Sequence, residues 1–117
     1  METCACCGFN TIGEKGCYEI CDICYWEDDN VQEADPWFPG GANSPSLYQA
    51  QLNFQKFGAM EERFTSNVRE PNAEDKRNPK WRSLSVEDKS YCTTPSEIEK
   101  VWGTSHSTSY NYWERNA

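Results

Sequence analysis

The chain has 117 residues and a formal net charge of −8, so it is long enough for one small domain and too short for two ordinary ones. Only 37% of the residues are hydrophobic, but 14% are aromatic, which favours a folded domain with long polar connections over a disordered chain. The acid excess argues against a nucleic-acid-binding protein, which needs Lys and Arg for the phosphate backbone, and would suit a basic protein partner.

The sequence shows no signal for export or membrane insertion. No positively charged segment with an apolar run precedes the first cysteine, and no apolar stretch approaches the length of a transmembrane helix. We therefore expect a cytoplasmic protein, in which thiols stay reduced. Six of the seven cysteines lie within the first 24 residues, and such crowding in a cytoplasmic chain favours a metal site over a disulfide framework.

Two Cys-x-x-Cys motifs, here called the first and second knuckle, stand at Cys4–Cys7 and Cys21–Cys24. The two-residue gap lets the backbone turn back, so that both sulfur atoms of a knuckle face one ion. Four thiolates form the closed tetrahedron that Zn²⁺ prefers in structural sites. The sequence therefore predicts a structural Zn²⁺ with the ligands Cys4, Cys7, Cys21 and Cys24.

The segment between the knuckles fits a β-hairpin. Phe9–Ile12 and Cys17–Ile20 can form its strands, and Gly13–Gly16 supplies the turn. Gly8 permits a positive φ where the first knuckle turns. We expect a zinc-ribbon-like arrangement in which the hairpin brings the two knuckles together.

Two other uses of the cysteines fit the sequence less well. A redox pair would sit near a βαβ pattern, which is missing from the sequence. A catalytic zinc would keep an open position, usually with His among its ligands, whereas His106 stands far away in a Ser/Thr-rich segment. Cys6 and Cys17 are expected to pack as small hydrophobic side chains, although either could lie near the metal. Cys92 has no assigned role.

Three consecutive acids, Glu27, Asp28 and Asp29, follow the second knuckle. They are candidate residues of a partner-binding surface. They could instead form a solvated loop or hydrogen-bond to nearby backbone. A metal-dependent hydrolase using these carboxylates is a further alternative, although adjacent side chains of an extended segment point to opposite faces. No catalytic residue is assigned.

The pattern after residue 45 predicts one amphipathic helix, from about Ser46 to Phe57. Ser46 can cap it, Gln49 completes a capping box, and Gly58 suits the C-terminal cap. The spacing of three and four residues defines an apolar stripe of Leu47, Ala50, Phe54 and Phe57. We expect this stripe to pack on the hairpin.

The remaining chain predicts wrapping segments. Residues 65–84, here called the strap, are polar, with Trp81 expected to dock on the core and Arg82 to pair with an acid. Residues 1–84 are expected to form the zinc-binding domain. Residues 85–117 are expected to pack on it as an extension, with a helix that begins after Thr94 and an aromatic segment that ends at Trp113.

Several ordered motifs resemble the bacterial cysteine-rich CPCC family over about residues 3–84. They are CACCGFNTI, YEICDICYWEDD, GGAN, SL, FGAMEERF and PKWR. The chain departs from the family pattern at Ala5 and Asp22, where Pro is usual, and at Cys17, and no predicted ligand is lost. The resemblance implies a small zinc-binding protein and no established activity.

Together these features predict an α+β fold: a small zinc-stabilised domain with a zinc-ribbon-like hairpin, one central amphipathic helix and long wrapping loops. The predicted function is a non-enzymatic protein-binding module, in its most specific form an immunity protein that neutralises a cognate bacterial toxin with a basic surface. The alternatives are a metal-dependent hydrolase and a nucleic-acid-binding zinc ribbon. No membrane partner is expected.

Overall fold

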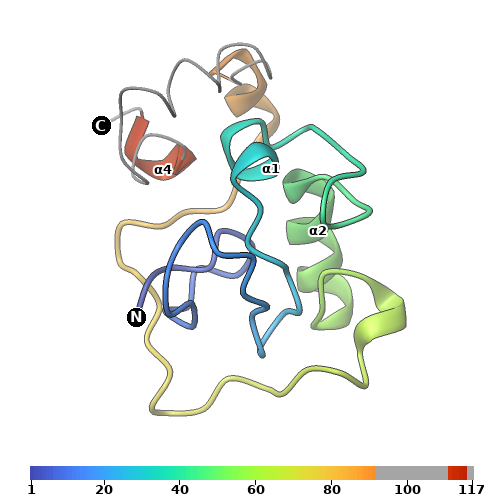
Figure 1. Cartoon of the computed structure of the whole chain (residues 1–117), viewed down its shortest axis with the longest axis vertical. Coiled ribbons are helices and arrows are strands. Elements are labelled where there is room, and N and C mark those ends of the chain that lie inside the picture. The colour runs from blue at the N-terminus through green and yellow to red at the C-terminus, as the bar shows by residue number, and fades with distance from the viewer. Residues whose placement is uncertain (92–110, 116–117) are drawn as a thin grey trace.

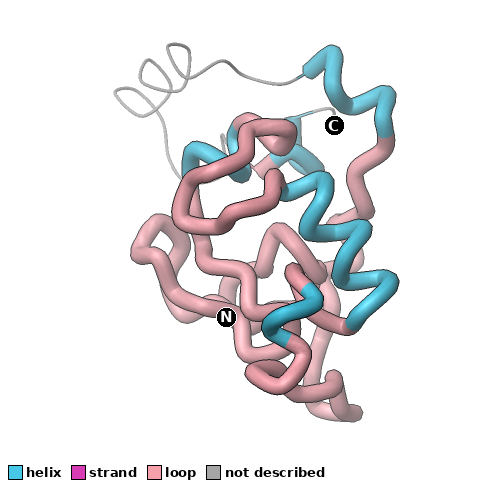
Figure 2. Tube along the Cα trace, turned by 90° about the vertical axis from the view of Figure 1, so that its right-hand side faces the viewer, coloured by secondary structure: helices cyan, strands magenta, loops and turns pink. Residues whose placement is uncertain are grey.

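The computed structural model describes residues 1–91 and 111–115. These residues form short helices that are joined by long loops (Figures 1 and 2). The helical elements are α1 (Asn30–Ala34), α2 (Leu47–Phe57), the 3₁₀ helices η1 (Glu62–Phe64) and η2 (Val86–Tyr91), and α4 (Tyr112–Arg115). Among the described residues, no helix combines the length and apolar character required to cross a membrane.

Helix α2 confirms the predicted amphipathic helix. The Ser46 hydroxyl accepts a hydrogen bond from the Gln49 amide over 3.1 Å, and Gly58 ends the helix at a φ of 80°. The predicted capping box is only half formed, because the Gln49 side chain donates to Asn53 instead. Helix α2 turns Leu47, Ala50 and Gln51 towards the interior. Its caps and apolar face are therefore encoded locally in the sequence.

The predicted β-hairpin is wrong. Residues 1–91 and 111–115 contain no strand, only isolated bridges, two of which pair Glu2 with Ile12 and Ile20 with Glu27. Each of these bridges closes around one knuckle instead of joining the two. Tyr18, at a φ of 57°, breaks the extended backbone that the second strand would need. The α+β class is replaced by a small domain of helices and loops.

The strap wraps the N-terminal loops as predicted. Figure 1 shows it leaving η1 and passing around the N-terminal segment before it reaches η2. Its backbone joins both knuckles, since the Arg69 amide donates to the Asp22 carbonyl and the Asn78 amide to the Gly8 carbonyl. Trp81 packs against the core cluster.

The prediction that Arg82 pairs with an acidic side chain is also confirmed. The Arg82 guanidinium lies 2.8 Å from Asp88.

The core gathers side chains from both ends of the chain. The knuckle cysteines, Ile12, Trp26 and Leu47 are buried together with Tyr112 and Trp113 of α4. The Tyr112 hydroxyl donates to the Arg82 carbonyl and accepts from the side-chain amide of Gln51. Cys92, His106 and the helix expected after Thr94 lie outside the described residues. The division of the chain after residue 84 stays a prediction.

Candidate metal centre

The two knuckles share one backbone conformation. In the first, the Gly8 amide donates to the Cys4 carbonyl over 2.8 Å, and in the second the Tyr25 amide donates to the Cys21 carbonyl over 2.8 Å. The donor residue has a positive φ in both, 82° at Gly8 and 71° at Tyr25. Gly8 takes this conformation without strain, as the sequence predicted, whereas a side chain at Tyr25 makes it costly.

This shared conformation brings four buried sulfur atoms together. The Sγ atoms of Cys4 and Cys24 lie 3.5 Å apart and those of Cys7 and Cys21 lie 3.7 Å apart, and all four atoms lie within 4.8 Å of one another. A disulfide would hold its sulfurs at about 2.05 Å, so these thiols are free. A tetrahedral Zn²⁺ with bonds of about 2.3 Å would hold its sulfurs about 3.8 Å apart. The cluster therefore has the size of a tetrahedral metal site.

The electrostatics of the cluster favour a cation. Burial raises the pKa of the Cys4 and Cys24 thiols, because a buried thiolate loses its hydration. Cys21 is the exception: hydrogen bonds from Cys24, Cys4 and Cys7 lower its pKa, and the Thr11 hydroxyl donates to its sulfur over 3.0 Å. A divalent cation bound here would deprotonate the coordinating thiols and offset the charge of their sulfurs.

The donor set also limits the chemistry. Thiolates are soft ligands that select zinc or iron–sulfur centres over Mg²⁺ or Ca²⁺. Four protein ligands fill a tetrahedron and leave no position for water or substrate. The described residues place no histidine or carboxylate in the cluster. The arrangement suits a structural metal rather than a catalytic one.

Cys6 and Cys17 both lie outside the four-sulfur cluster. Cys6 is buried in the core, as expected of a small hydrophobic side chain, but Cys17 is exposed. The prediction for Cys17 is wrong because its neighbours Gly16 and Tyr18 both have positive φ values and form a surface turn rather than a strand.

The strap clasps the first knuckle. The Trp81 indole N–H donates to the Ala5 carbonyl and the Arg77 guanidinium to the Cys7 carbonyl, both over 2.9 Å. The indole also lies against Gly8, where an added Cβ would stand 2.5 Å from Trp81 Cδ2. Gly8 is thus required twice, for its φ and for this close approach. Sequence spacing gives no signal for a contact between residues so far apart.

The three acids after the second knuckle have different environments. The Asp28 carboxylate is buried and accepts from the Gly16 amide over 2.6 Å. Asp29 is also buried and caps α1, accepting from the backbone of residues 31, 32 and 42. Hydrogen bonding to loop backbone, one of the alternatives drawn from the sequence, therefore describes both. Glu27 is half-buried, and its carboxylate has no partner among the described residues.

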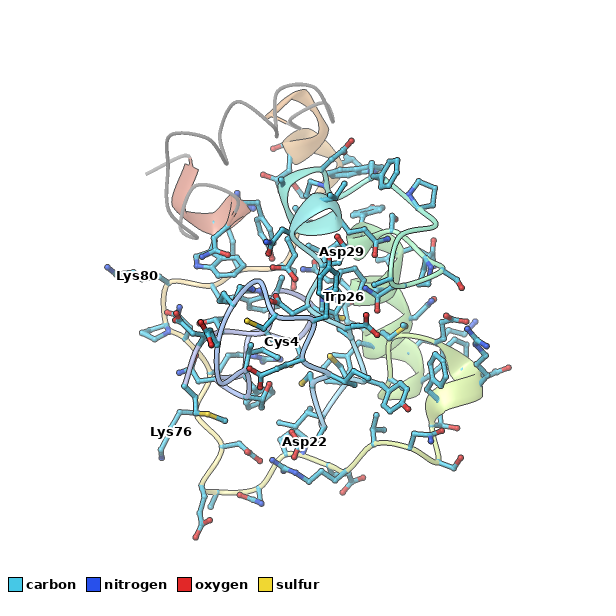
Figure 3. The ribbon with its side chains drawn as sticks, in the orientation of Figure 1. Cys4, Asp22, Trp26, Asp29, Lys76 and Lys80 are labelled. Carbon is cyan, nitrogen blue, oxygen red and sulfur yellow. The ribbon has the colours of Figure 1, made fainter. Side chains whose placement is uncertain are left out.

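Lys15 joins these acids to α1 in a buried ion cluster that the sequence did not predict. Its ammonium lies 2.9 Å from Asp28 and 2.6 Å from Glu33, and all three side chains are at most 3% exposed. The Trp26 indole also donates to Glu33 over 3.0 Å. Figure 3 places Trp26 and Asp29 inside the fold with Cys4.

The cluster carries an imbalance of charge, with two carboxyl groups facing one ammonium. Burial raises the pKa of Glu33 to about 8, although the Lys15 ammonium opposes the shift. The pKa of Asp28 is lowered despite burial, because Glu33 and Lys15 both interact with it. Burial thus favours a proton on Glu33, whereas the Lys15 ammonium favours both carboxylates.

Comparison with known proteins adds one finding. The family model described as cysteine-rich CPCC matches residues 2–75. That stretch contains both knuckles, α1, α2, η1 and the first part of the strap. No match to a curated protein was found for this chain.

Proposed function

Because the chain belongs to the cysteine-rich CPCC family, we propose that it is a small zinc protein whose metal is structural and which acts by binding another protein. The observation that carries this proposal is the closed set of four buried sulfur atoms within 4.8 Å of one another. Such a site supplies folding free energy and offers no open coordination position. Because the metal cannot bind a substrate, the protein would act through side chains on its surface.

Zinc is the metal that fits this site best. Cys4, Cys7, Cys21 and Cys24 would be its ligands, and the Thr11 hydroxyl would orient the Cys21 sulfur. Metal analysis of protein purified without added metal should give one zinc and no iron per chain. An iron–sulfur cluster, which also uses four thiolates, would instead give a brown protein with visible absorbance and would overturn the assignment.

The partner we propose is a basic protein, of the kind that an acidic immunity protein neutralises when it covers a toxin. The net charge of −8 supports this choice, because complementary charge steers association and makes it dependent on salt. Capture from the native host should recover one basic protein whose binding weakens steeply between 50 and 500 mM NaCl. Recovery of no partner, or of one whose binding is insensitive to salt, would contradict the proposal.

The alternative functions receive little support from the described residues. A hydrolase would need free carboxylates, but those of Asp28 and Asp29 already accept hydrogen bonds from the backbone. A nucleic-acid-binding role conflicts with the acidic charge. Turnover of model ester and phosphodiester substrates by the zinc-loaded chain, or a gel shift at low salt, would reinstate the corresponding alternative.

A further inference from the structure

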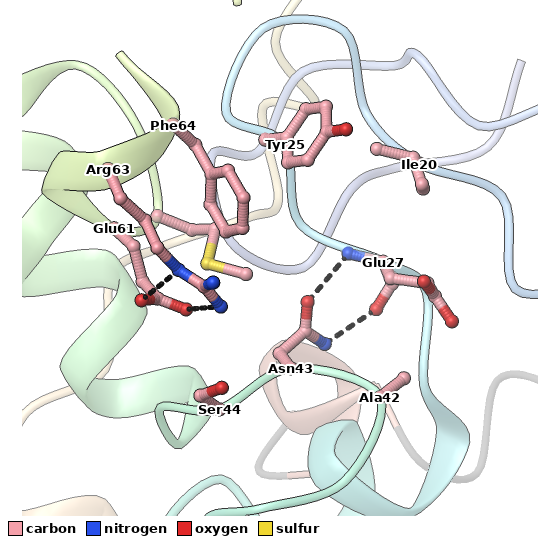
Figure 4. Close-up of a pocket in the computed structure, with 10 residues that line it drawn as sticks. Ile20, Tyr25, Glu27, Ala42, Asn43, Ser44, Glu61, Arg63 and Phe64 are labelled. Atoms are coloured by element: carbon pink, nitrogen blue, oxygen red, sulfur yellow. Dashed lines mark hydrogen bonds and ion pairs between the residues drawn. The ribbon is translucent and has the colours of Figure 1, made fainter. Parts of the chain in front are cut away.

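A small pocket of about 70 Å³ opens beside the second knuckle. Figure 4 shows its walls: Tyr25 and Ile20 on one side, Phe64 with Arg63 and Glu61 on another, and Asn43 below. Its apolar wall is unusual for a surface, because Ile20 is 47% exposed and the rings of Tyr25 and Phe64 meet 4.6 Å apart, centroid to centroid. Exposed apolar side chains that gather around a hollow mark a binding site more often than scattered ones do.

The pocket is held in shape by buried groups. Asn43 is 1% exposed, and its side-chain amide both accepts from the Glu27 amide and donates to the Glu27 carbonyl, each over 2.8 Å. On the opposite wall, the Met60 amide donates to the Cys24 carbonyl over 2.7 Å. The pocket is therefore anchored to the metal knuckle and is preformed, which lowers the entropic cost of binding.

The charges at the rim are unequal. Arg63 is paired with Glu61 over 2.9 Å and its guanidinium lies 4.4 Å from the Phe64 ring. The Glu27 carboxylate has no partner among the described residues. One unmatched negative charge thus borders an apolar hollow, a combination complementary to an apolar side chain with a cation next to it.

The first knuckle shows which groups complete a surface of this kind. There, Trp81 of the strap covers the turn and donates to a knuckle carbonyl, while the Arg77 guanidinium lies 5.3 Å from the indole ring. Beside the second knuckle, Phe64 of η1 packs on Tyr25 in a similar way, with its neighbour Arg63 over the Phe64 ring, and no residue of the strap lines the hollow next to them. An aromatic side chain with an adjacent arginine is therefore a chemistry that this fold already uses to cover a knuckle.

We propose that the pocket beside the second knuckle is where the protein binds its partner, and that it receives an aromatic side chain flanked by Arg or Lys from a basic protein segment. One edge of the aromatic ring enters the hollow against Tyr25 and Phe64, and the flanking cation pairs with Glu27. This inference rests on the proposed protein-binding function and gives it a location and a recognised chemistry.

The test uses the zinc-loaded full chain, labelled with ¹⁵N, and short peptides blocked at both ends. Titration with the peptide GRWRG should shift the backbone amides of Tyr25, Glu27 and Phe64 and the side-chain amide of Asn43. Replacing the peptide's Trp by Ala should weaken binding about tenfold, since an aromatic side chain is no longer buried. Replacing its Arg residues by Glu should abolish binding.

Two variants test the role of charge. Glu27→Gln should weaken binding of GRWRG about two- to fivefold, the range for a partly exposed ion pair. Glu62→Gln is the matched control, because Glu62 is exposed in η1 but does not line the pocket. Neither carboxylate makes a hydrogen bond or ion pair with another described residue, so both variants should keep the stability of the parent.

Three outcomes would overturn the inference: no binding of GRWRG, shifts centred on another surface, or equal effects of the Glu27 and Glu62 variants. Any of these would reject the pocket while leaving the zinc site and partner binding elsewhere on the molecule standing. The proposed function itself would be rejected by different results, namely a chain that contains no zinc or a partner capture that does not depend on salt. The two failures are therefore distinguishable.

Discussion

The two knuckles have the same backbone conformation but different surroundings. The first is clasped by a distant part of its own chain, with Trp81 against Gly8 and Arg77 on the Cys7 carbonyl. The second carries Tyr25 at the position that corresponds to Gly8 and borders an open pocket. A metal knuckle of this type leaves backbone carbonyls and a turn to be covered. The corresponding carbonyls of the second knuckle, at Asp22 and Cys24, accept from the backbone amides of Arg69 and Met60, so the two knuckles differ in the pocket beside the second rather than in unpaired carbonyls.

The two knuckles also differ in backbone strain. The first knuckle has a conformation that glycine takes without strain and a close-packed cover. The second holds an aromatic residue in the left-handed region, a conformation that costs about 1–2 kcal/mol. Strain of this kind persists where surrounding contacts fix it and often accompanies a functional surface. Four predictions test this contrast, beginning with the feature that the knuckles share.

The largest effect should follow from removing a sulfur ligand from either knuckle. Cys7→Ser and Cys21→Ser should each abolish stoichiometric zinc binding and the cooperative unfolding transition, because structural zinc contributes about 10 kcal/mol or more. Metal analysis and circular dichroism during heating measure both effects. Cys17→Ser, at an exposed thiol outside the cluster, is the control and should behave like the parent. If either ligand variant unfolds cooperatively without metal, the zinc is not structural.

The next largest effect should come from Lys15, which connects the two knuckle regions. Its ammonium donates to the Thr3 carbonyl before the first knuckle and pairs with Asp28 after the second. Lys15→Met would leave buried carboxyl groups without their cation and should lower the free energy of unfolding by about 3–5 kcal/mol. Urea denaturation of the zinc-loaded protein measures the change.

Arg69 provides the comparison for Lys15, because it also pairs with two acids but is 41% exposed in its side chain. Arg69→Met should lower the free energy of unfolding far less than Lys15→Met does, because exposed ion pairs contribute little to stability. Equal losses from the two substitutions would show that burial of the Lys15 cluster does not stabilise the fold.

Most elements that the sequence predicts correctly have local causes, although the docking of Trp81 on the core is a long-range contact. Ser46 and Gly58 cap α2 through contacts within a few residues. The Cys-x-x-Cys spacing likewise sets the geometry of each knuckle through its own backbone bonds, and Gly8 has the positive φ expected of it. Each of these depends on residues that are neighbours in the sequence, so pattern and propensity suffice.

The missed elements depend on contacts across long stretches of chain. Phe9 forms its bridge with Arg77, so residues after the first knuckle turn towards the strap rather than towards the predicted second strand. Lys15 and Glu33 form an ion pair that no spacing rule indicates. The sequence predicts a surface position for Asp28 and Asp29, because acidic residues are seldom buried. Only the folded chain supplies the hydrogen-bond donors that allow these two carboxylates to be buried.

A medium effect should follow from crowding the cover of the first knuckle. Gly8→Ala places a Cβ 2.5 Å from the Trp81 ring at a φ of 82°, so it should cost about 1–2 kcal/mol for the backbone conformation and about 1–3 kcal/mol more for overpacking. Gly58→Ala isolates the first contribution, because Gly58 has a φ of 80° and nothing within 4 Å of an added Cβ. Denaturation of both variants gives the difference.

Combining Gly8→Ala with Trp81→Ala sharpens that measurement. If the added methyl group clashes with the indole, the double variant should lose less free energy of unfolding than the two single variants lose in sum. Additive losses, or equal costs at Gly8 and Gly58, would mean that Trp81 does not cover the first knuckle closely.

The smallest effect tests the strained residue of the second knuckle. Tyr25→Gly and Tyr25→Ala both remove the ring that meets Phe64, so they lose the same aromatic contact. In ordinary helical or extended backbone, Ala is favoured over Gly by about 0.5–1 kcal/mol. At a φ of 71° the order should reverse, with the Gly variant more stable by about 1 kcal/mol, because only Ala retains the left-handed strain. Urea denaturation of the two zinc-loaded variants decides the order. An Ala variant as stable as the Gly variant would show that Tyr25 is unstrained, and the contrast between the two knuckles would then rest on packing alone.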